Sequence, residues 1–386
     1  MLLRMLVVIS VASLILFGLH YYVYDRLVRY LSLGPTEQRA LKLTLGTLYA
    51  LLWLAMPFSR VLRLQVARPV MFGVFIWLGM LVMFSIALFG GDLARWTLAL
   101  IERVRPTPTD PTRRAFLERT LGFVTLGLGG VLSGYSLFEG LRRVAVKRVS
   151  VSLSRLPQSL SGFRIVQVTD LHVGPTIDGR WLQQVVDQIN ALSPDAVAIT
   201  GDLIDAPVSV LREHVAPLQG LKAAHGVYFV TGNHEYYSGP DEWIAELGRL
   251  GVRVLRNERV TVRKGDAAID IAGIDDHHSG SHPGHGPDLP RAMAQRDPQR
   301  PVVLLAHQPI AVHEAAAHGV DLQLSGHTHG GQIYPWRYLV RLQQPFIAGL
   351  HRIQSTMLYV SCGTGYWGPP MRLGAPAEIT ELTLVS

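Results

Sequence analysis

The sequence predicts a layered α/β domain that follows a set of membrane-spanning helices. Four long uncharged stretches lie within the first 138 residues, and from Gly162 onward short β-branched runs alternate with amphipathic helical stretches. The distribution of charge supports this division. Residues 1–150 contain 18 Lys and Arg against 7 Asp and Glu, whereas the remaining residues contain 18 against 22. The chain therefore has a basic, apolar part and an acidic part.

The composition excludes several classes of protein. Charged residues make up only 17% of the 386 residues and the mean hydropathy is +0.23, which excludes a disordered or collagen-like chain. The lone Cys362 excludes an intramolecular disulfide framework and a thiolate zinc cluster. The net charge of +7 comes from the apolar part, so it does not indicate a nucleic-acid-binding patch.

The four uncharged stretches are predicted to span a membrane. Their lengths are 20, 17, 23 and 19 residues, and they cover residues 5–24, 43–59, 69–91 and 120–138. A spanning helix needs about 20 predominantly apolar residues. The alternative, buried helices of a soluble protein, is less consistent with four such runs so close together. We therefore expect a membrane domain over residues 1–140 with about four transmembrane helices.

Two signals bear on the orientation of this membrane domain. With the N-terminus outside, the inner loops hold ten Lys and Arg and the outer segments eight, and cytoplasmic loops are the enriched ones. Residues 112–117, Thr-Arg-Arg-Ala-Phe-Leu, resemble a twin-arginine export signal. The alternative is an ordinary arginine pair beside a membrane helix. We expect a multi-pass protein of the cell membrane whose C-terminal domain lies outside the cytoplasm.

The acidic part is expected to form the α/β domain over residues 161–386, joined by a juxtamembrane linker over residues 141–160. Strands are predicted at 163–169, 196–200, 227–231, 269–274, 302–306, 322–324, 357–361 and 378–385. Helices are predicted at 178–192 and 241–250. Strands that alternate with helices are typical of a layered α/β domain.

Residues able to bind metal follow five of the predicted strands. They are Asp170 with His172, Gly201-Asp202, Gly232-Asn233-His234-Glu235, His307, and Gly326-His327-Thr328-His329-Gly330. Loops at the carboxyl ends of such strands converge on one crevice. A single histidine after a strand is more often a structural residue, but five such strand ends predict one metal centre. Imidazole, carboxylate and amide donors without thiolate suit manganese, iron or zinc.

These motifs, in this order, resemble those of the calcineurin-like metallophosphoesterases over residues 160–384. The resemblance implies a four-layer α/β/β/α sandwich and two divalent metal ions. It implies a first ion held by Asp170, His172, Asp202 and His329, and a second held by Asp202, Asn233, His307 and His327. Asp202 would bridge the two ions. The resemblance also implies that His234 acts on the phosphate as a general acid or an electrostatic stabiliser, with Asp205 as its orienting partner.

Within this family the sequence resembles a membrane-linked branch of bacterial cell-envelope phosphoesterases and, more distantly, enzymes that split UDP-diacylglucosamine. The resemblance rests on Gly330-Gly331-Gln332, Gly363-Thr364-Gly365, Pro370, Arg372, Pro376 and Glu378. It implies a membrane-anchored hydrolase of a phosphomonoester, phosphodiester or pyrophosphate, of an envelope lipid or a nucleotide-linked lipid precursor. The alternative is a catalytically inactive binding or regulatory module attached to a membrane protein, whose signature would be missing ligands.

Three further features leave alternatives open. Arg372 is either a bidentate ligand of the substrate phosphate or a solvated surface residue. Residues 275–286, rich in His, Gly and Ser, form a third metal site, a mobile flap beside the active site or a flexible surface loop. Residues 333–347 mix aromatic, aliphatic and basic residues and lie either at the lipid bilayer interface or against their own domain. The interface alternative predicts an amphiphilic substrate.

Overall fold

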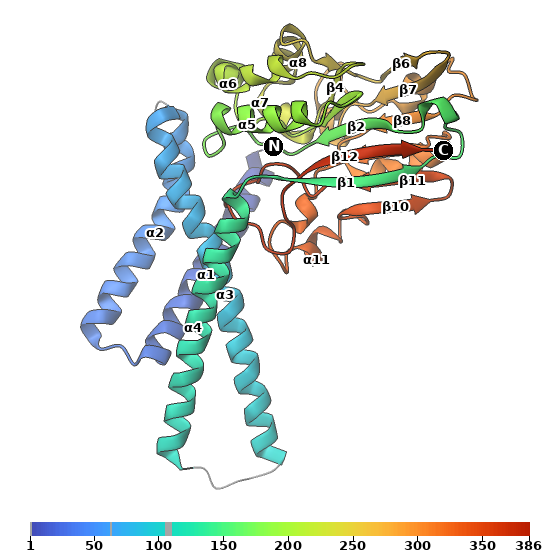
Figure 1. Ribbon diagram of the computed structural model, residues 1–386. Coiled ribbons are helices and arrows are strands. Elements are labelled where there is room, and N and C mark those ends of the chain that lie inside the picture. The colour runs from blue at the N-terminus through green and yellow to red at the C-terminus, as the bar shows by residue number, and fades with distance from the viewer. Residues whose placement is uncertain (1, 62–63, 105–109) are drawn as a thin grey trace. The chain divides into compact units, whose positions relative to one another are not determined.

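The computed structural model describes residues 2–61, 64–104 and 110–386 (Figure 1). The chain divides into two compact units. The helical unit comprises Met1–Phe138 with Gly368–Met371, and the α/β unit comprises Glu139–Trp367 with Arg372–Ser386. A four-residue segment near the C-terminus thus belongs to the helical unit, although the sequence placed the whole range 161–386 in one domain.

The helical unit is built from four long helices. They are α1 (Leu2–Leu31), α2 (Pro35–Val61), α3 (Leu64–Val104) and α4 (Pro111–Leu141). Among the described residues, three segments are long and apolar enough to cross a membrane: Leu6–Leu31, Leu64–Val104 and Phe116–Leu141. Helix α2, which holds the shortest uncharged stretch, is not among them. The arginine pair of the export-like motif lies in the first turns of α4, and its side chains are outside the described residues.

Glycines of α4 allow close packing within the helical unit. A Cβ atom at Gly122 would lie 2.8 Å from the Tyr30 Cβ of α1, and one at Gly129 would lie 2.6 Å from the Phe84 ring of α3. Because small residues let helix backbones approach, the glycine content of this apolar stretch has a packing role. Val23, Tyr30, Leu81 and Leu88 form a buried cluster between α1 and α3.

The α/β unit contains two six-stranded mixed sheets, in agreement with the two packed sheets that the family resemblance implies. The first has the order β1 (Ala145–Ser152), β12 (Glu378–Val385), β2 (Phe163–Val168), β3 (Ala196–Thr200), β4 (Val227–Val230) and β5 (Arg253–Val254). The second has the order β10 (Gly349–Ile353), β11 (Thr356–Val360), β9 (Leu322–Ser325), β8 (Val302–Leu305), β7 (Ala267–Gly273) and β6 (Glu258–Lys264). Strands β2 to β5 are parallel, and so are β7, β8, β9 and β11.

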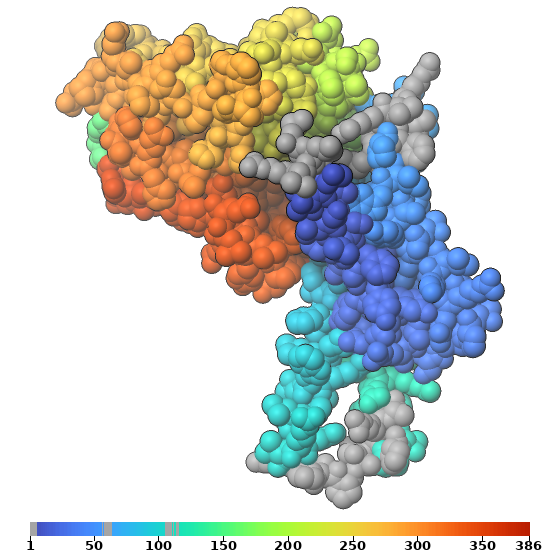
Figure 2. Space-filling view, turned by 180° about the vertical axis from the view of Figure 1, so that it is seen from behind, coloured from blue at the N-terminus to red at the C-terminus, as the bar shows by residue number. Residues whose placement is uncertain are grey.

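The two sheets pack face to face with helices outside, which confirms the expected four-layer sandwich. Their inner faces share one core, in which Phe163 and Leu382 of the first sheet meet Leu324 and Tyr359 of the second. Helices α5 (Gly179–Ala191), α6 (Val208–Val215), α7 (Asn233–Ser238) and α8 (Pro240–Arg249) follow strands of the first sheet (Figure 1). Helices α9 (Leu289–Met293) and α10 (Val312–Ala317) pack on the second sheet. Their part of the chain forms the orange surface in Figure 2.

Local sequence explains where these helices form. The side chain of Asp178 caps α5 by accepting hydrogen bonds from the backbone N–H groups of Arg180 and Trp181, both at 3.1 Å. Leu182, Val185, Val186 and Ile189 are buried at the helical spacing of one apolar face. The shortest helix, α11 (Arg337–Val340), has no buried residue.

The range predicted to be a linker contains strand β1. Its eight residues pair with β12 in parallel register, from Ala145 with Glu378 to Ser152 with Val385. Adjacent charges favour a linker over a strand, but here Lys147 contacts Glu378 at 3.1 Å and Arg148 contacts Glu381 at 2.8 Å. The parallel pairing with β12 therefore holds this segment as a strand at the edge of the sheet, and the two ion pairs join it to the same neighbour.

Candidate metal centre

Five loops at the carboxyl ends of strands carry the predicted site residues. Asp170 and His172 follow β2, and Asp202 and Asp205 follow β3. Asn233 and His234 begin α7 directly after β4. His307 follows β8 of the second sheet, and His327 with His329 follows β9. Both sheets therefore contribute residues to one site.

Six of the predicted metal ligands come together in two groups. Within each group the ligand atoms lie within 4.8 Å of one another; the groups are Asp170, His172 and His329, and Asp202, His307 and His327. The Oδ2 atom of Asp202 lies 3.1 Å from His307 Nε2 and 4.0 Å from His172 Nε2. This carboxylate is therefore within reach of both groups, as a bridging ligand must be.

The donor set fits divalent metal ions. The Nε2 atoms of His172 and His329 face each other at 3.1 Å, an arrangement in which at least one nitrogen offers a lone pair. The buried Oδ1 of Asn233 has no hydrogen-bond partner among the described residues. A buried acceptor without a partner is costly, and a cation would satisfy it. The mixture of imidazole, carboxylate and amide oxygen suits manganese, iron or zinc.

Five of the predicted ligands adopt backbone conformations that side chains rarely take. Their φ angles are positive: 53° at Asp170, 47° at His172, 51° at Asp202, 69° at His327 and 49° at His329. Glycines complete the tight turns, since a Cβ atom at Gly232 would overlap the Asp202 carboxylate. Such strain persists only where the surrounding structure holds it in place.

Backbone groups orient the ligands. His307 Nδ1 donates a hydrogen bond to the Thr200 carbonyl at 2.7 Å, which leaves Nε2, 3.1 Å from Asp202 Oδ2, as the ring atom that could bind an ion in place of its proton. The His327 N–H contacts both carboxylate oxygens of Asp170 at 3.0 Å, and the His234 N–H donates to Asp202 Oδ1 at 2.9 Å. The carboxylates are therefore fixed before any ion binds.

Burial and neighbouring charges both shift the pKa values of the site residues, and at Asp202 and His172 the two effects oppose each other. Burial would raise the pKa of Asp202, but the charge and hydrogen bond of His307 hold that pKa well below its usual value. Burial would lower the pKa of His172, but Asp205 raises it to about 9. At His327, burial and the charge of His307 both act in one direction and lower the pKa to about 3. A bound cation would take the place of the proton that His172 otherwise holds.

Asp205 contacts two imidazoles. Its Oδ1 lies 2.7 Å from His234 Nδ1, which places it as the expected orienting partner, and also 2.8 Å from His172 Nδ1. Burial would raise the pKa of Asp205, but the charges and hydrogen bonds of these histidines lower it to about 2. One carboxylate thus orients a predicted metal ligand and the predicted catalytic histidine together.

Glu235 ties two of the loops together, a role that the sequence analysis did not assign. Its buried carboxylate accepts hydrogen bonds from the backbone N–H groups of Asp202 at 3.1 Å, Leu203 at 2.8 Å and Gly232 at 2.6 Å. Burial and the nearby charge of Asp202 raise the pKa of Glu235 to about 7. The capping-box position of this residue, three residues into α7, was the available signal.

Two aromatic residues that the sequence analysis did not single out flank His234. The ring centroid of Tyr237 lies 5.4 Å from the His234 ring, and that of Trp367 lies 6.0 Å away. Both are exposed, Tyr237 to 72% and Trp367 to 58%. The Gln332 side chain donates to the Trp367 carbonyl and accepts from the Trp367 N–H, each at 3.0 Å. We call Tyr237 and Trp367 the aromatic collar.

Arg372 is buried and holds a loop of the α/β unit, so its guanidinium is not available to bind substrate. The residue is buried, and its five N–H groups donate to backbone carbonyls of Cys362, Gly363, Gly365 and Ala375. Burial lowers its pKa to about 10. Both sequence alternatives, a phosphate ligand and a solvated arginine, are therefore wrong, because a guanidinium with every donor satisfied holds the loop around residues 362–375.

No residue of the histidine-rich segment 275–286 belongs to the groups of possible metal ligands found among the described residues. Its residues His277–Ser281 form a short 3-10 helix capped by Asp276. The two carboxylate oxygens of Asp276 also accept from the side-chain Nε2 of Gln308, at 3.2 and 3.0 Å, next to the predicted ligand His307. The segment is therefore attached to the edge of the site by its acidic residue.

Comparisons with known proteins agree with this geometry. The family model described as calcineurin-like phosphoesterase matches residues 163–331. A transmembrane protein with metallophosphoesterase domain from Bos taurus is 43% identical over 71% of this chain and 64% of its own length. An uncharacterized metallophosphoesterase from Campylobacter jejuni is 32% identical over 98% of both chains.

A search of solved structures found a phosphopantetheinyl hydrolase from Mycobacterium tuberculosis, at 14% identity and a TM-score of 0.35. That match covers 55% of this chain and 96% of the hydrolase. The chain spans less than two thirds of the length of the bovine relative. Motifs, site geometry and relatives together show that this chain belongs to the calcineurin-like metallophosphoesterases and carries their metal-dependent phosphoester hydrolase domain.

Proposed function

We propose that this protein is a membrane-anchored phosphoesterase that uses two divalent metal ions and acts on an amphiphilic phosphoester. An envelope lipid or a nucleotide-linked lipid precursor is the substrate class we favour. The observation that carries the proposal is the position of Asp202, whose Oδ2 lies within 4.0 Å of ligand nitrogens from both groups. A carboxylate so placed is suited to hold two cations side by side.

The site residues have two proposed roles, which are to hold the metal ions and to protonate the leaving group. The first group, with Asp202, would hold one ion, and the second group, with Asn233, would hold the other. When bound, these ions would supply Lewis-acid activation of water and of the phosphoryl oxygens. His234 would serve the leaving oxygen, because its Nδ1 is held by Asp205 and its Nε2 remains the atom that can carry a proton toward substrate.

Replacing the proposed bridge tests the two-metal assignment. We expect Asp202→Asn to abolish turnover and to lower the metal content from two ions toward one ion per chain, because an amide cannot supply two anionic oxygens. Metal content would be measured by inductively coupled plasma mass spectrometry on the purified full chain. Asp266→Asn, an exposed aspartate, is the matched control and should keep both ions. An active Asp202→Asn protein with two ions would contradict the assignment.

Replacing His234 separates proton transfer from metal binding. We expect His234→Ala to retain both ions and to lower kcat by about 10²- to 10⁴-fold, the usual contribution of general acid catalysis. The loss should be smaller for a 4-nitrophenyl ester than for an alkyl ester, since nitrophenolate leaves without protonation. Equal losses for both leaving groups would argue for phosphate stabilisation instead, and loss of an ion would make His234 a ligand.

The aromatic collar supports an amphiphilic substrate. Exposing two large aromatic rings beside a catalytic histidine is unfavourable in water unless they contact an apolar group of the substrate. The two hydrogen bonds with Gln332 fix the backbone of Trp367 beside the site. Further exposed side chains lie at Tyr334, Trp336, Tyr338, Leu339 and Leu342. Their composition suits the headgroup region of a bilayer, where such a substrate would reside.

Replacing Trp367 of the aromatic collar by a smaller residue tests whether the substrate is amphiphilic. We expect Trp367→Ala to raise KM about tenfold for hexyl 4-nitrophenyl phosphate and much less for methyl 4-nitrophenyl phosphate, because each buried methylene contributes about 0.8 kcal/mol. Trp367→Phe should restore most of the difference. Trp336→Ala removes a similarly exposed indole away from His234 and should change neither KM. Equal effects of Trp367→Ala on the two esters would contradict an apolar contact.

The surface of the helical unit supports anchoring in a bilayer. Phe123, Val124 and Val131 of α4, like Leu14 and Ile15 of α1, are more than half exposed. Large apolar side chains on a long helix are costly in water and favourable in lipid. We place the α/β unit outside the cytoplasm because of the export-like Arg113 and Arg114 and because of the slight charge bias, which assumes that α2 crosses the membrane as a fourth span.

Reporter fusions test this side of the membrane. Alkaline phosphatase joined after Leu141 should be active, because it folds only after export, and a fusion after Gly34 should be inactive. The reverse pattern would place the α/β unit in the cytoplasm. Replacing Arg113 and Arg114 together by Lys should keep the α/β unit inside. An unchanged location in that double variant would contradict only the export-signal interpretation.

A further inference from the structure

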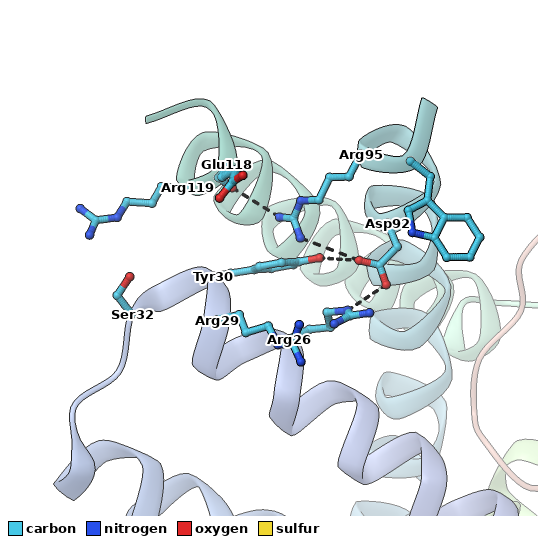
Figure 3. Close-up of a pocket in the computed structure, with 9 residues that line it drawn as sticks. Arg26, Arg29, Tyr30, Ser32, Asp92, Arg95, Glu118 and Arg119 are labelled. Carbon is cyan, nitrogen blue, oxygen red and sulfur yellow. Dashed lines mark hydrogen bonds and ion pairs between the residues drawn. The ribbon is translucent and has the colours of Figure 1, made fainter. Parts of the chain in front are cut away.

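The helical unit contains a basic cavity away from the metal centre. The cavity has a volume of about 460 Å³ and lies between α1, α3 and α4 (Figure 3). Its charged lining consists of Arg26, Arg29, Arg95, Arg119, Asp92 and Glu118. A volume of this size is within the usual range for small-molecule sites in proteins.

The sequence places this cavity at the edge of the apolar stretches. Asp25 and Arg26 directly follow the uncharged stretch 5–24, and Asp92 directly follows the stretch 69–91. Arg119 directly precedes the stretch 120–138. The cavity is therefore formed where three apolar helices first become charged. In a bilayer that level is the headgroup region, where lipid phosphates lie.

An ordered network holds one side of the cavity. Asp92 accepts hydrogen bonds of 2.8 Å from the hydroxyls of Tyr22 and Tyr30 and from Arg26 Nε. The Arg95 guanidinium lies 3.7 Å from the centroid of the Tyr30 ring, and Figure 3 shows Arg26, Tyr30 and Arg95 converging on Asp92. This carboxylate is thus satisfied by its own network, which packs α1 against α3.

Arg29 and Arg119 have fewer interactions with other side chains than Arg26 and Arg95 have. Arg29 is 66% exposed, and within the described part of the chain it forms an ion pair with Asp25 at 2.9 Å; exposed pairs of this kind contribute little. Arg119 stands apart from the Asp92 cluster in Figure 3 and forms no ion pair with any described residue. Even when Asp25 is counted with Asp92 and Glu118, the four arginines leave a positive excess around the cavity.

We propose that this cavity binds the phosphate group of an anionic membrane lipid. Guanidinium groups match phosphate oxygens bidentately, and basic pockets between transmembrane helices are suited to lipid headgroups. Arg29 and Arg119 supply the contacts to phosphate, while the Asp92 network fixes the wall. The inference rests on the proposed placement of the helices in a bilayer and is independent of the hydrolytic reaction.

Lipid binding by the purified full chain tests this site. Phosphatidylglycerol would be titrated into the detergent-solubilised protein and the bound fraction measured by native mass spectrometry. We expect Arg29→Gln and Arg119→Gln each to weaken binding about tenfold, the loss for one charge-assisted hydrogen bond. Arg39→Gln, an exposed arginine of α2 outside the cavity, is the matched control and should bind as the unaltered protein does.

The outcomes separate this site from the other proposals. Affinities of the two cavity variants that equal the Arg39→Gln control would overturn the site. Binding of glycerol 3-phosphate or inorganic phosphate as tight as that of phosphatidylglycerol would overturn the lipid source, and equal binding of phosphatidylcholine would overturn the preference for anionic lipid. Carbonate extraction of the unaltered protein from membranes would contradict the anchoring itself, whereas a membrane-bound protein without lipid selectivity would contradict only this inference.

Discussion

The crowding of buried charge around Asp202 is the constraint on which the rest of the α/β unit depends. Two buried carboxylates and three buried imidazoles share one crevice, and burying charged groups is costly unless each has partners. Backbone N–H groups supply some of those partners, at Asp170 from His327 and at Asp202 from His234. Five of the ligands also have left-handed backbone conformations, and each such conformation costs about 1–3 kcal/mol of strain energy. Binding of metal ions at this site would offset the free-energy cost of the buried charges and of the strained backbone.

The two packed sheets hold the ends of the strands in place, and the loops that carry the metal ligands begin at those strand ends. The shared core holds the sheets face to face, and Gln167 of β2 links them close to the site. Its amide donates to the Thr200 hydroxyl of β3 at 2.8 Å and to the Ser325 carbonyl of β9 at 3.0 Å. The loops of Asp202 and His327 begin directly after these two residues. A change in how the sheets pack would therefore move one ligand group relative to the other.

Residues that follow an apolar run were predictable from the sequence, whereas residues placed by tertiary contacts were not. Strands β3 and β12 have the predicted bounds, because their β-branched runs end abruptly in polar residues. The aromatic collar was missed because Tyr237 and Trp367 lie 130 positions apart and meet only across His234. Asp205 was expected to serve one histidine, since sequence order cannot reveal that a single oxygen reaches His172 as well.

The arginines show how the role of one residue type depends on the donors it has left. All five N–H groups of Arg372 are taken by carbonyls, so this guanidinium could bind a phosphate only by releasing the loop that it holds. Arg26 shares its donors between Asp25 and Asp92 and is largely committed to packing α1 against α3. Arg119 forms no ion pair within the described part of the chain. The number of hydrogen-bond donors already in use therefore assigns a structural role to Arg372, and leaves ligand binding to arginines at the ends of the apolar stretches of the helical unit.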